Sequence, residues 1–267
     1  VSTIDVVTGA AVGTYPVGVS PWGIAFDGTN IWVTNQTTNT VSKLNGSTGA
    51  TIGTYSLPAS STPKAIVFDG ASAVWTANYG TNTVTKVSTS NGAIVGTYAL
   101  PAASLPDGIA SDGYSIWTAN SGTSAVTRIN KSTGAIIATY ALPVSSGPSD
   151  IIFDGAFIWT ANYSGASVTK IKASSGGIIG TYSLPASPYA LALDQPGYAT
   201  TNVAGDPRTF IWTANNTSDS ITKIDALTGA VVATYPGSAR PLALAFDGTN
   251  MWVANEAGGS ITKIQVR

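Results

Sequence analysis

The chain has 267 residues, of which 9% are charged, and its net charge is -1. This composition offers no basic surface for nucleic acid or an anionic membrane, and no apolar run is long enough to span a bilayer. Cysteine and histidine are both absent, which excludes disulfides, thiolate metal sites and catalysis by histidine.

The predicted elements are short strands from the N-terminus onward. The first segment, "VSTIDVVTGAAVGTYP", matches the second half of a unit that is complete for the first time at residues 21–57. That unit contains the four stretches "WGIAFD", "IWVTN", "TVSKLN" and "TIGTYSL". Alternating apolar and polar residues, rich in β-branched and aromatic types and separated by Gly, Asn and Pro, predict strands and not helices.

The unit occurs six times in one register. A Pro is followed six positions later by an Asp at Pro21/Asp27, Pro63/Asp69, Pro106/Asp112, Pro148/Asp154, Pro188/Asp194 and Pro241/Asp247. A Trp is followed three positions later by an Asn at Trp32/Asn35, Trp75/Asn78, Trp117/Asn120, Trp159/Asn162, Trp212/Asn215 and Trp252/Asn255. A period of about 40 to 45 residues with four strands is typical of a β-propeller blade.

The sequence therefore predicts an all-β, six-bladed β-propeller with four antiparallel strands per blade. We expect one domain over residues 1–267, with residues 1–16 as a closing segment whose outer strand joins the C-terminal blade. The stretch 195–210 is expected to be an insertion in a turn of the fifth blade.

The strings "WVTN" at 32–35, "WTAN" at 75, 117, 159 and 212, and "WVAN" at 252 resemble the YVTN family of β-propeller repeats, with Trp in place of Tyr. The resemblance implies an extracellular or cell-surface prokaryotic protein, in some cases in surface layers or adhesion, and no single activity. Virginiamycin B lyase is similar in general build. That enzyme relies on a catalytic histidine, which this chain lacks, so the resemblance does not extend to lyase activity.

Charged and amide side chains that recur in every unit are predicted to be scaffold. They comprise the six Asp residues, the six Asn residues, and one cation per unit at Lys43, Lys86, Arg128, Lys170, Lys223 and Lys263. Asp and Asn side chains satisfy backbone groups in turns, and a cation can pair between strands.

The residue after each repeated Pro differs in every unit, and the propeller topology places all six on one face, here called the upper face. These residues are Trp22, Lys64, Asp107, Ser149, Tyr189 and Leu242, with Tyr79, Tyr163, Asp150, Arg240 and Glu256 nearby. Mixed charges with aromatic residues suit a glycan or peptide site. The candidate ligand residues are Trp22, Lys64, Asp107, Asp150, Tyr189, Arg240 and Glu256. The alternative is that these solvent-exposed positions vary by sequence drift and bind no ligand.

A metal-dependent, lactonase-like hydrolase is a further alternative. Some six-bladed propellers of similar outline hold a divalent cation with Glu, Asn and Asp, and Glu256, Asn215, Asp107 and Asp150 provide those residue types. Nothing in their spacing requires a metal. We therefore predict no catalytic residue, no metal and no cofactor.

One strand type is present in surplus. The cation-bearing third strand occurs seven times if "VSTID" is counted with "SITKI", whereas the other three types occur six times. Residues 1–6 could fray or lie along the outside, could compete with the C-terminal copy and leave one of the two free, or could complete a blade of another chain. In such an exchange the chains contact one another head-to-tail, so the assembly need not close into a ring and can grow into a filament. The candidate assembly residues are Val1, Ser2, Thr3, Ile4, Asp5 and Val6.

We therefore predict a non-catalytic extracellular or cell-surface protein with a structural or adhesive role that self-assembles into a filament or layer. Its exposed Ser and Thr residues are candidates for glycosylation. The expected partners are copies of the chain, with glycans or other surface proteins as alternatives, and neither nucleic acid nor a membrane span is expected. Because the chain begins inside a repeat, we expect Val1 to follow a processing or excision site.

Overall fold

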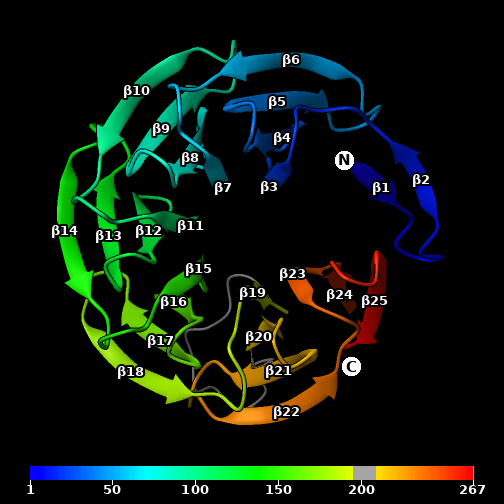
Figure 1. The fold of residues 1–267 in the computed structure, drawn as a ribbon, viewed down its shortest axis with the longest axis vertical. Coiled ribbons are helices and arrows are strands. Elements are labelled where there is room, and N and C mark those ends of the chain that lie inside the picture. Colours follow the sequence, from blue (N-terminus) through cyan, green and yellow to red (C-terminus); the bar gives the residue numbers. More distant parts are fainter. Residues whose placement is uncertain (195–208, 267) are drawn as a thin grey trace. The chain divides into compact units, whose positions relative to one another are not determined.

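Strands are the only regular elements in the part of the chain that the computed structural model describes, residues 1–194 and 209–266 (Figure 1). They form the predicted all-β, six-bladed β-propeller. Among these residues no helix is long and apolar enough to cross a membrane. Most of the stretch predicted as an insertion, 195–208, lies outside the described residues.

The strands follow one another in the order of the repeats. An N-terminal hairpin and the first three blades contain β1 (Ser2–Ile4), β2 (Ala11–Thr14); β3 (Pro21–Phe26), β4 (Asn30–Asn35), β5 (Thr40–Asn45), β6 (Thr51–Ser56); β7 (Pro63–Phe68), β8 (Ala73–Asn78), β9 (Thr83–Ser88), β10 (Ile94–Ala99); β11 (Pro106–Ser111), β12 (Ser115–Asn120), β13 (Ala125–Asn130) and β14 (Ile136–Ala141). The last three blades contain β15 (Pro148–Phe153), β16 (Phe157–Asn162), β17 (Ser167–Lys172), β18 (Ile178–Ser183); β19 (Ala190–Leu193), β20 (Phe210–Asn215), β21 (Ser220–Asp225), β22 (Val231–Pro236); β23 (Pro241–Phe246), β24 (Asn250–Asn255) and β25 (Ser260–Gln265).

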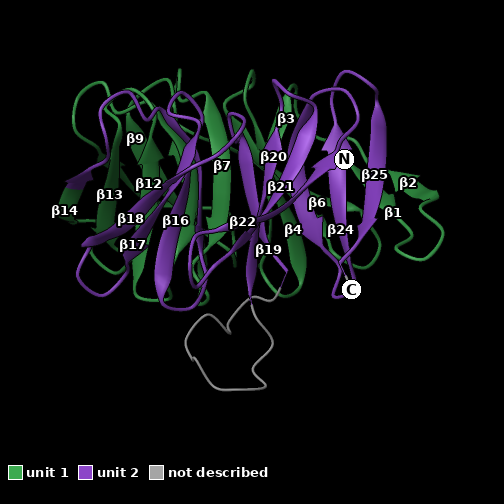
Figure 2. Cartoon of the chain, turned by 90° about the horizontal axis from the view of Figure 1, so that it is seen from below, with its two compact units in different colours: residues 1–139 green, residues 140–267 purple. Residues whose placement is uncertain are grey.

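The chain divides into two compact units, residues 1–139 and 140–267 (Figure 2). In each unit the buried Trp of one blade packs with aliphatic side chains of the next blade along the chain, as Trp32 does with Val74 and Val87 and Trp212 with Met251 and Val253. Apolar burial between successive blades is what stabilises a repeat array of this kind. The expectation of one domain over residues 1–267 stays a prediction.

The repeated Asp fixes the turn between the first two strands of a blade and the indole that follows. In blade 1, Asp27 accepts hydrogen bonds from the amides of Thr29 (2.9 Å) and Asn30 (2.6 Å) and from Nε1 of Trp32 (2.7 Å). The same Asp–Trp bond is present at Asp112/Trp117, Asp154/Trp159, Asp194/Trp212 and Asp247/Trp252. In blade 2 one extra residue separates the pair, and Nε1 of Trp75 is buried without a hydrogen-bond partner.

The repeated cation and Asn also act within the scaffold. The cation of the third strand lies about 5 Å from the indole centroid of the same blade in all six blades, a cation–π contact. The Asn amide donates to hydroxyls of the third strand, as Asn162 does to Ser167 (3.1 Å) and Thr169 (2.8 Å). The scaffold interpretation of these residues is therefore confirmed.

Strand pairing at the two ends differs from the predicted closure, in which the N-terminal outer strand joins the C-terminal blade. Instead, β2 pairs with β1 in a two-stranded sheet, and the last sheet has three strands in the order β23-β24-β25. The reason is that β1 is itself a copy of a third strand and offers β2 the partner that an outer strand requires. Fraying of residues 1–6 is accordingly wrong for Ser2–Ile4.

Candidate functional site

The N-terminal hairpin reproduces the outer two strands of a blade. Ser2 pairs with Thr14 and Thr3 with Gly13, and the register shifts directly after Thr3. Strands β5 and β6 pair in the same register, with the shift at the same place. The hydroxyls of Ser2 and Thr14 are 3.1 Å apart, the distance also found between the corresponding hydroxyls of blade 2.

The turn of this hairpin has the same hydrogen bonds as the turn between the third and fourth strands of a blade. The Asp5 carboxylate accepts hydrogen bonds from the amides of Val7 (2.9 Å) and Thr8 (2.7 Å), and the Gly9 amide donates to the Asp5 carbonyl (2.8 Å). Asn45 holds the turn of blade 1 in the same way. The hairpin is therefore a half blade that lacks the first two strands.

Tyr15 docks this half blade onto blade 1. A Cβ at Gly49 would fall on the Tyr15 ring, so the ring lies directly against the backbone of the blade 1 turn. The same contact joins successive blades at Tyr55/Gly92, Tyr98/Gly134, Tyr140/Gly176 and Tyr182/Gly229. The hairpin thus occupies the position that a preceding blade would take.

A pocket of about 200 Å³ lies where the hairpin meets blade 1. We call it the hairpin pocket. It is lined by Val1, Thr3, Tyr15, Ile31 and Leu44, together with residues of the turn at 45–49. At the next junction the corresponding space holds an indole, which stacks on the tyrosine of its own blade at a centroid distance of 5.9 Å. The hairpin has no second strand and brings no Trp to this space.

Apolar side chains remain exposed on blade 1 and on the last blade. Ile24 and Phe26 of β3 are 58% and 57% exposed, whereas Ile66, at the position of Ile24 in blade 2, is 7% exposed. In the last blade Trp252 is partly exposed, although the Trp of the second strand is fully buried in each of the other five blades. Ile261 of β25 is 46% exposed.

The structure brings the six predicted assembly residues together at the hairpin. Ser2, Thr3 and Ile4 form β1, Asp5 caps the turn, and the Val1 amine donates to the Tyr15 carbonyl (2.9 Å). Val6 lies exposed in the turn. The hairpin pocket and the partial exposure of Trp252 were not predicted from the sequence, although the recurring spacing of Trp, Tyr and Gly was the available signal.

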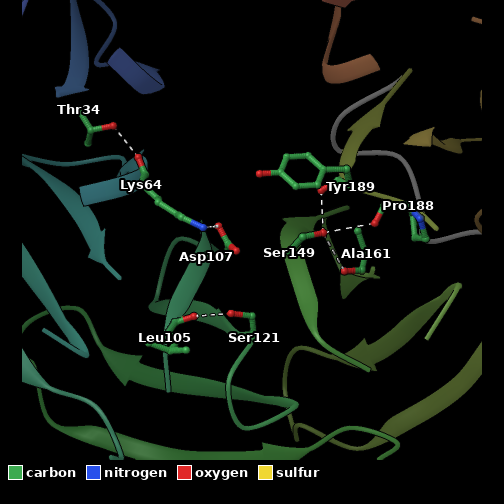
Figure 3. Close-up of polar contacts among 9 residues, drawn as sticks. All are labelled: Thr34, Lys64, Leu105, Asp107, Ser121, Ser149, Ala161, Pro188 and Tyr189. Carbon is green, nitrogen blue, oxygen red and sulfur yellow. Dashed lines mark hydrogen bonds and ion pairs between the residues drawn. The ribbon is translucent and has the colours of Figure 1, made fainter. Parts of the chain in front are cut away.

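Three of the predicted ligand residues form one cluster in the first unit. The Lys64 ammonium is 2.8 Å from the Asp107 carboxylate and lies 4.0 Å from the ring centroid of Tyr79 and 5.8 Å from that of Trp22. Figure 3 shows the Lys64 side chain extended toward Asp107. Burial raises the pKa of Asp107, and the attraction of Lys64 offsets this only in part.

Two predicted ligand residues in the second unit have structural contacts. The Asp150 carboxylate accepts hydrogen bonds from the amides of Ile151 and Leu191, both at 2.8 Å. The Tyr189 carbonyl accepts one from the Ser149 hydroxyl at 2.8 Å (Figure 3). The Tyr189 ring contacts Tyr163 edge to face.

The remaining predicted pair, Arg240 and Glu256, forms an ion pair of 3.0 Å in which both side chains are about half exposed. Such surface pairs contribute little to stability. Among residues 1–194 and 209–266, no group of three carboxylate side chains is placed to hold a metal ion.

The model of the virginiamycin B lyase family matches residues 7–204 of this chain. No curated protein sequence matches it.

Solved structures share the fold at low sequence identity. A catalytically inactive histidine-to-alanine variant of virginiamycin B lyase from Staphylococcus aureus, with quinupristin, is 23% identical at a TM-score of 0.81, covering 100% of this chain and 87% of that chain. A streptogramin B lyase is 21% identical at a TM-score of 0.75, covering 94% and 84%. Hydrazine synthase of Kuenenia stuttgartiensis is 18% identical at a TM-score of 0.83, covering 99% and 89%.

Proposed function

We propose that this chain, which belongs to the virginiamycin B lyase family, is a non-catalytic subunit that assembles head-to-tail with copies of itself through its terminal strands. The observation that carries the proposal is the duplication of one strand. β1 and β25 are copies of the same third strand. β1 pairs with an outer strand, β2, in a sheet that has no first or second strand. β25 is the last strand of a sheet that has no outer strand.

The mismatch of these two ends supports exchange between copies. One copy offers the inner three strands of a blade, and the next offers the fourth. Such a contact joins different surfaces of the two copies, so repetition extends the assembly without closing it. The net charge of -1 means that copies repel one another little.

Two considerations separate this role from that of the lyases. Replacing a histidine by alanine gives the inactive Staphylococcus aureus enzyme, and this chain contains no histidine. The repeated charged residues are engaged in turns and blade contacts. We therefore assign to the chain the family's fold without the lyase reaction, and propose an extracellular or cell-surface setting for the assembly.

Sedimentation of the purified chain over a concentration series tests the assembly. We expect species of many subunits that grow with concentration, and extended particles by electron microscopy. A single species of one subunit at every concentration would refute the proposal.

Binding of a glycan or peptide at the upper face is a second candidate, favoured by the exposed Trp22 beside the Lys64–Asp107 pair. An aromatic face next to hydrogen-bonding groups suits such ligands. On a glycan or peptide array we expect Trp22→Ala to lose binding by roughly tenfold, or about 1.4 kcal/mol. Tyr114→Ala, at an exposed tyrosine outside the cluster, should bind like wild type; equal binding by both variants would reject this candidate.

A further inference from the structure

We infer that the upper face of the first unit binds a neutral sugar, whose adjacent hydroxyl groups bridge Lys64 and Asp107 while its ring packs on Trp22. The inference rests on the second candidate function proposed above, ligand binding at this face, and it does not depend on assembly. All the residues involved belong to residues 1–139, so the site lies within one compact unit.

β-bulges direct these three side chains toward one place. The first strands of the three blades, β3, β7 and β11, lie side by side (Figure 1). The pairing register of each strand shifts directly after its Pro, where Trp22, Lys64 and Asp107 follow. A bulge re-aims the side chain of the extra residue and is common beside functional sites. Lys64 of blade 2 thereby reaches Asp107 of blade 3 at 2.8 Å and lies beside Trp22 of blade 1.

The Lys64–Asp107 pair retains hydrogen-bonding capacity. Both side chains are mostly buried, at 15% and 13% exposure. An ionised carboxylate has about four acceptor sites, yet Lys64 is the one partner of the Asp107 carboxylate among the residues that the structure describes. The Asp27 carboxylate, by contrast, accepts hydrogen bonds from two amides and an indole. A buried group with unfilled capacity favours a ligand that brings its own hydrogen-bonding groups.

The site carries no net charge, because Lys64 and Asp107 balance one another. The other charged side chains of residues 1–139 belong to turns at the opposite ends of the strands or contact them, as Asp27 and Lys43 do. A charged ligand would therefore find no unpaired counter-charge here. This favours a neutral ligand.

A sugar supplies the groups that complement this arrangement. A hydroxyl both donates and accepts hydrogen bonds, so one hydroxyl accepts from the Lys64 ammonium while its neighbour donates to the Asp107 carboxylate. The C–H face of a sugar ring is apolar, and the Trp22 indole, which is 47% exposed, offers it an aromatic surface beside the pair. A cation–π contact with the Tyr79 ring, 4.0 Å from Lys64 Nζ, helps to hold the ammonium in place.

Saturation-transfer NMR tests the site with defined probes. The probes are cellotriose, mannotriose and galactotriose, the permethylated derivative of each, and one capped, uncharged tripeptide that contains tyrosine. We expect at least one free trisaccharide to bind wild type. Its permethylated derivative keeps the sugar ring but has no hydroxyl to donate, so it should not bind. Equal binding of the two forms would overturn the inference.

Two variants locate the binding. Asp107→Asn keeps the shape of the side chain but removes its charge, and Trp22→Ala removes the aromatic surface. Each should weaken binding of that trisaccharide by roughly tenfold or more. Asp5→Asn is the matched control, because Asn45 holds the equivalent turn of blade 1, and it should bind like wild type. Thermal unfolding checks that each variant is folded, and Trp22→Ala, at a half-exposed side chain, tests the site even where Asp107→Asn is unstable.

The remaining outcomes separate this inference from the functions proposed above. If a trisaccharide binds wild type and both site variants equally, it binds elsewhere and the inference is wrong. If only the tripeptide binds, and Trp22→Ala abolishes that binding, the upper face is a peptide site; the second candidate function then stands and the inference fails. If none of the probes binds wild type, both fail. Assembly is measured by sedimentation without any probe, so its outcome is independent of these results.

Discussion

Asp27 illustrates how one repeated side chain organises a blade. Its carboxylate accepts two backbone amides of the turn and the indole N–H of Trp32. Burial raises the pKa of Asp27, but the hydrogen bonds from Trp32, Asn30 and Thr29 outweigh burial, so this pKa lies below its usual value. The pKa of Asp247 is lowered mainly by the equivalent bond from Trp252.

The lowered pKa of Asp27 makes stability dependent on pH in a defined direction. The stabilisation by the charged carboxylate is complete above the pKa of an unfolded aspartate, about 3.9, and is lost as the pH falls through the lower folded-state pKa. Between about pH 5 and pH 2, the free energy of unfolding of wild type should fall more steeply than that of Asp27→Asn. Urea denaturation at several pH values measures both slopes, and equal slopes would contradict the account of this hydrogen bond.

At the scale of elements, β1 is a weaker partner for β2 than a complete third strand. It is three residues long, and it has Thr3 where the other third strands have a cation. It nevertheless keeps the hydroxyl contact between Ser2 and Thr14. β1 therefore covers the edge of β2 over fewer residues than a complete third strand does.

A disulfide between β1 and β2 should prevent β2 from completing the last blade of another copy, as the proposed assembly requires. In Ser2→Cys/Thr14→Cys we expect oxidation to lower the association constant at least roughly tenfold, or about 1.4 kcal/mol, and reduction to restore it. Ser42→Cys/Thr54→Cys places the same pair inside blade 1, where the hydroxyls are 3.3 Å apart, and should assemble in both states. Light scattering before and after reduction reports the difference; unimpaired assembly of the oxidised S2C/T14C protein would show that β1 stays in place.

For the whole molecule, the repeat predicted the blades and the roles of the recurring residues. The spacing of Asp27 and Trp32, repeated along the chain, was enough to predict the turns and the scaffold contacts. Both features join residues that are close together in the sequence. The pairing of β2 with β1 was not predicted, since sequence shows that two copies of the third strand exist but not which of them an outer strand selects.

The candidate site was predictable only in part. Lys64 and Asp107 were expected on one face, and they form an ion pair; the first six residues were identified as surplus, and they form the hairpin. The hairpin pocket depends on the packing of Tyr15 against Gly49 and on the exposure of Ile24 and Phe26. Such features arise from contacts between successive blades, which repeat spacing alone does not reveal.

Sedimentation velocity of wild type beside two single variants tests the central claim most directly. Ile261 is 46% exposed, although its counterpart Ile221 is fully buried, so completion of the last blade by another copy would bury it. We predict that wild type and Val232→Lys, changed at a side chain that remains exposed on an outer strand, form large assemblies, and that Ile261→Lys sediments as single subunits. Identical sedimentation of all three proteins, assembled or not, would contradict head-to-tail assembly through the last blade.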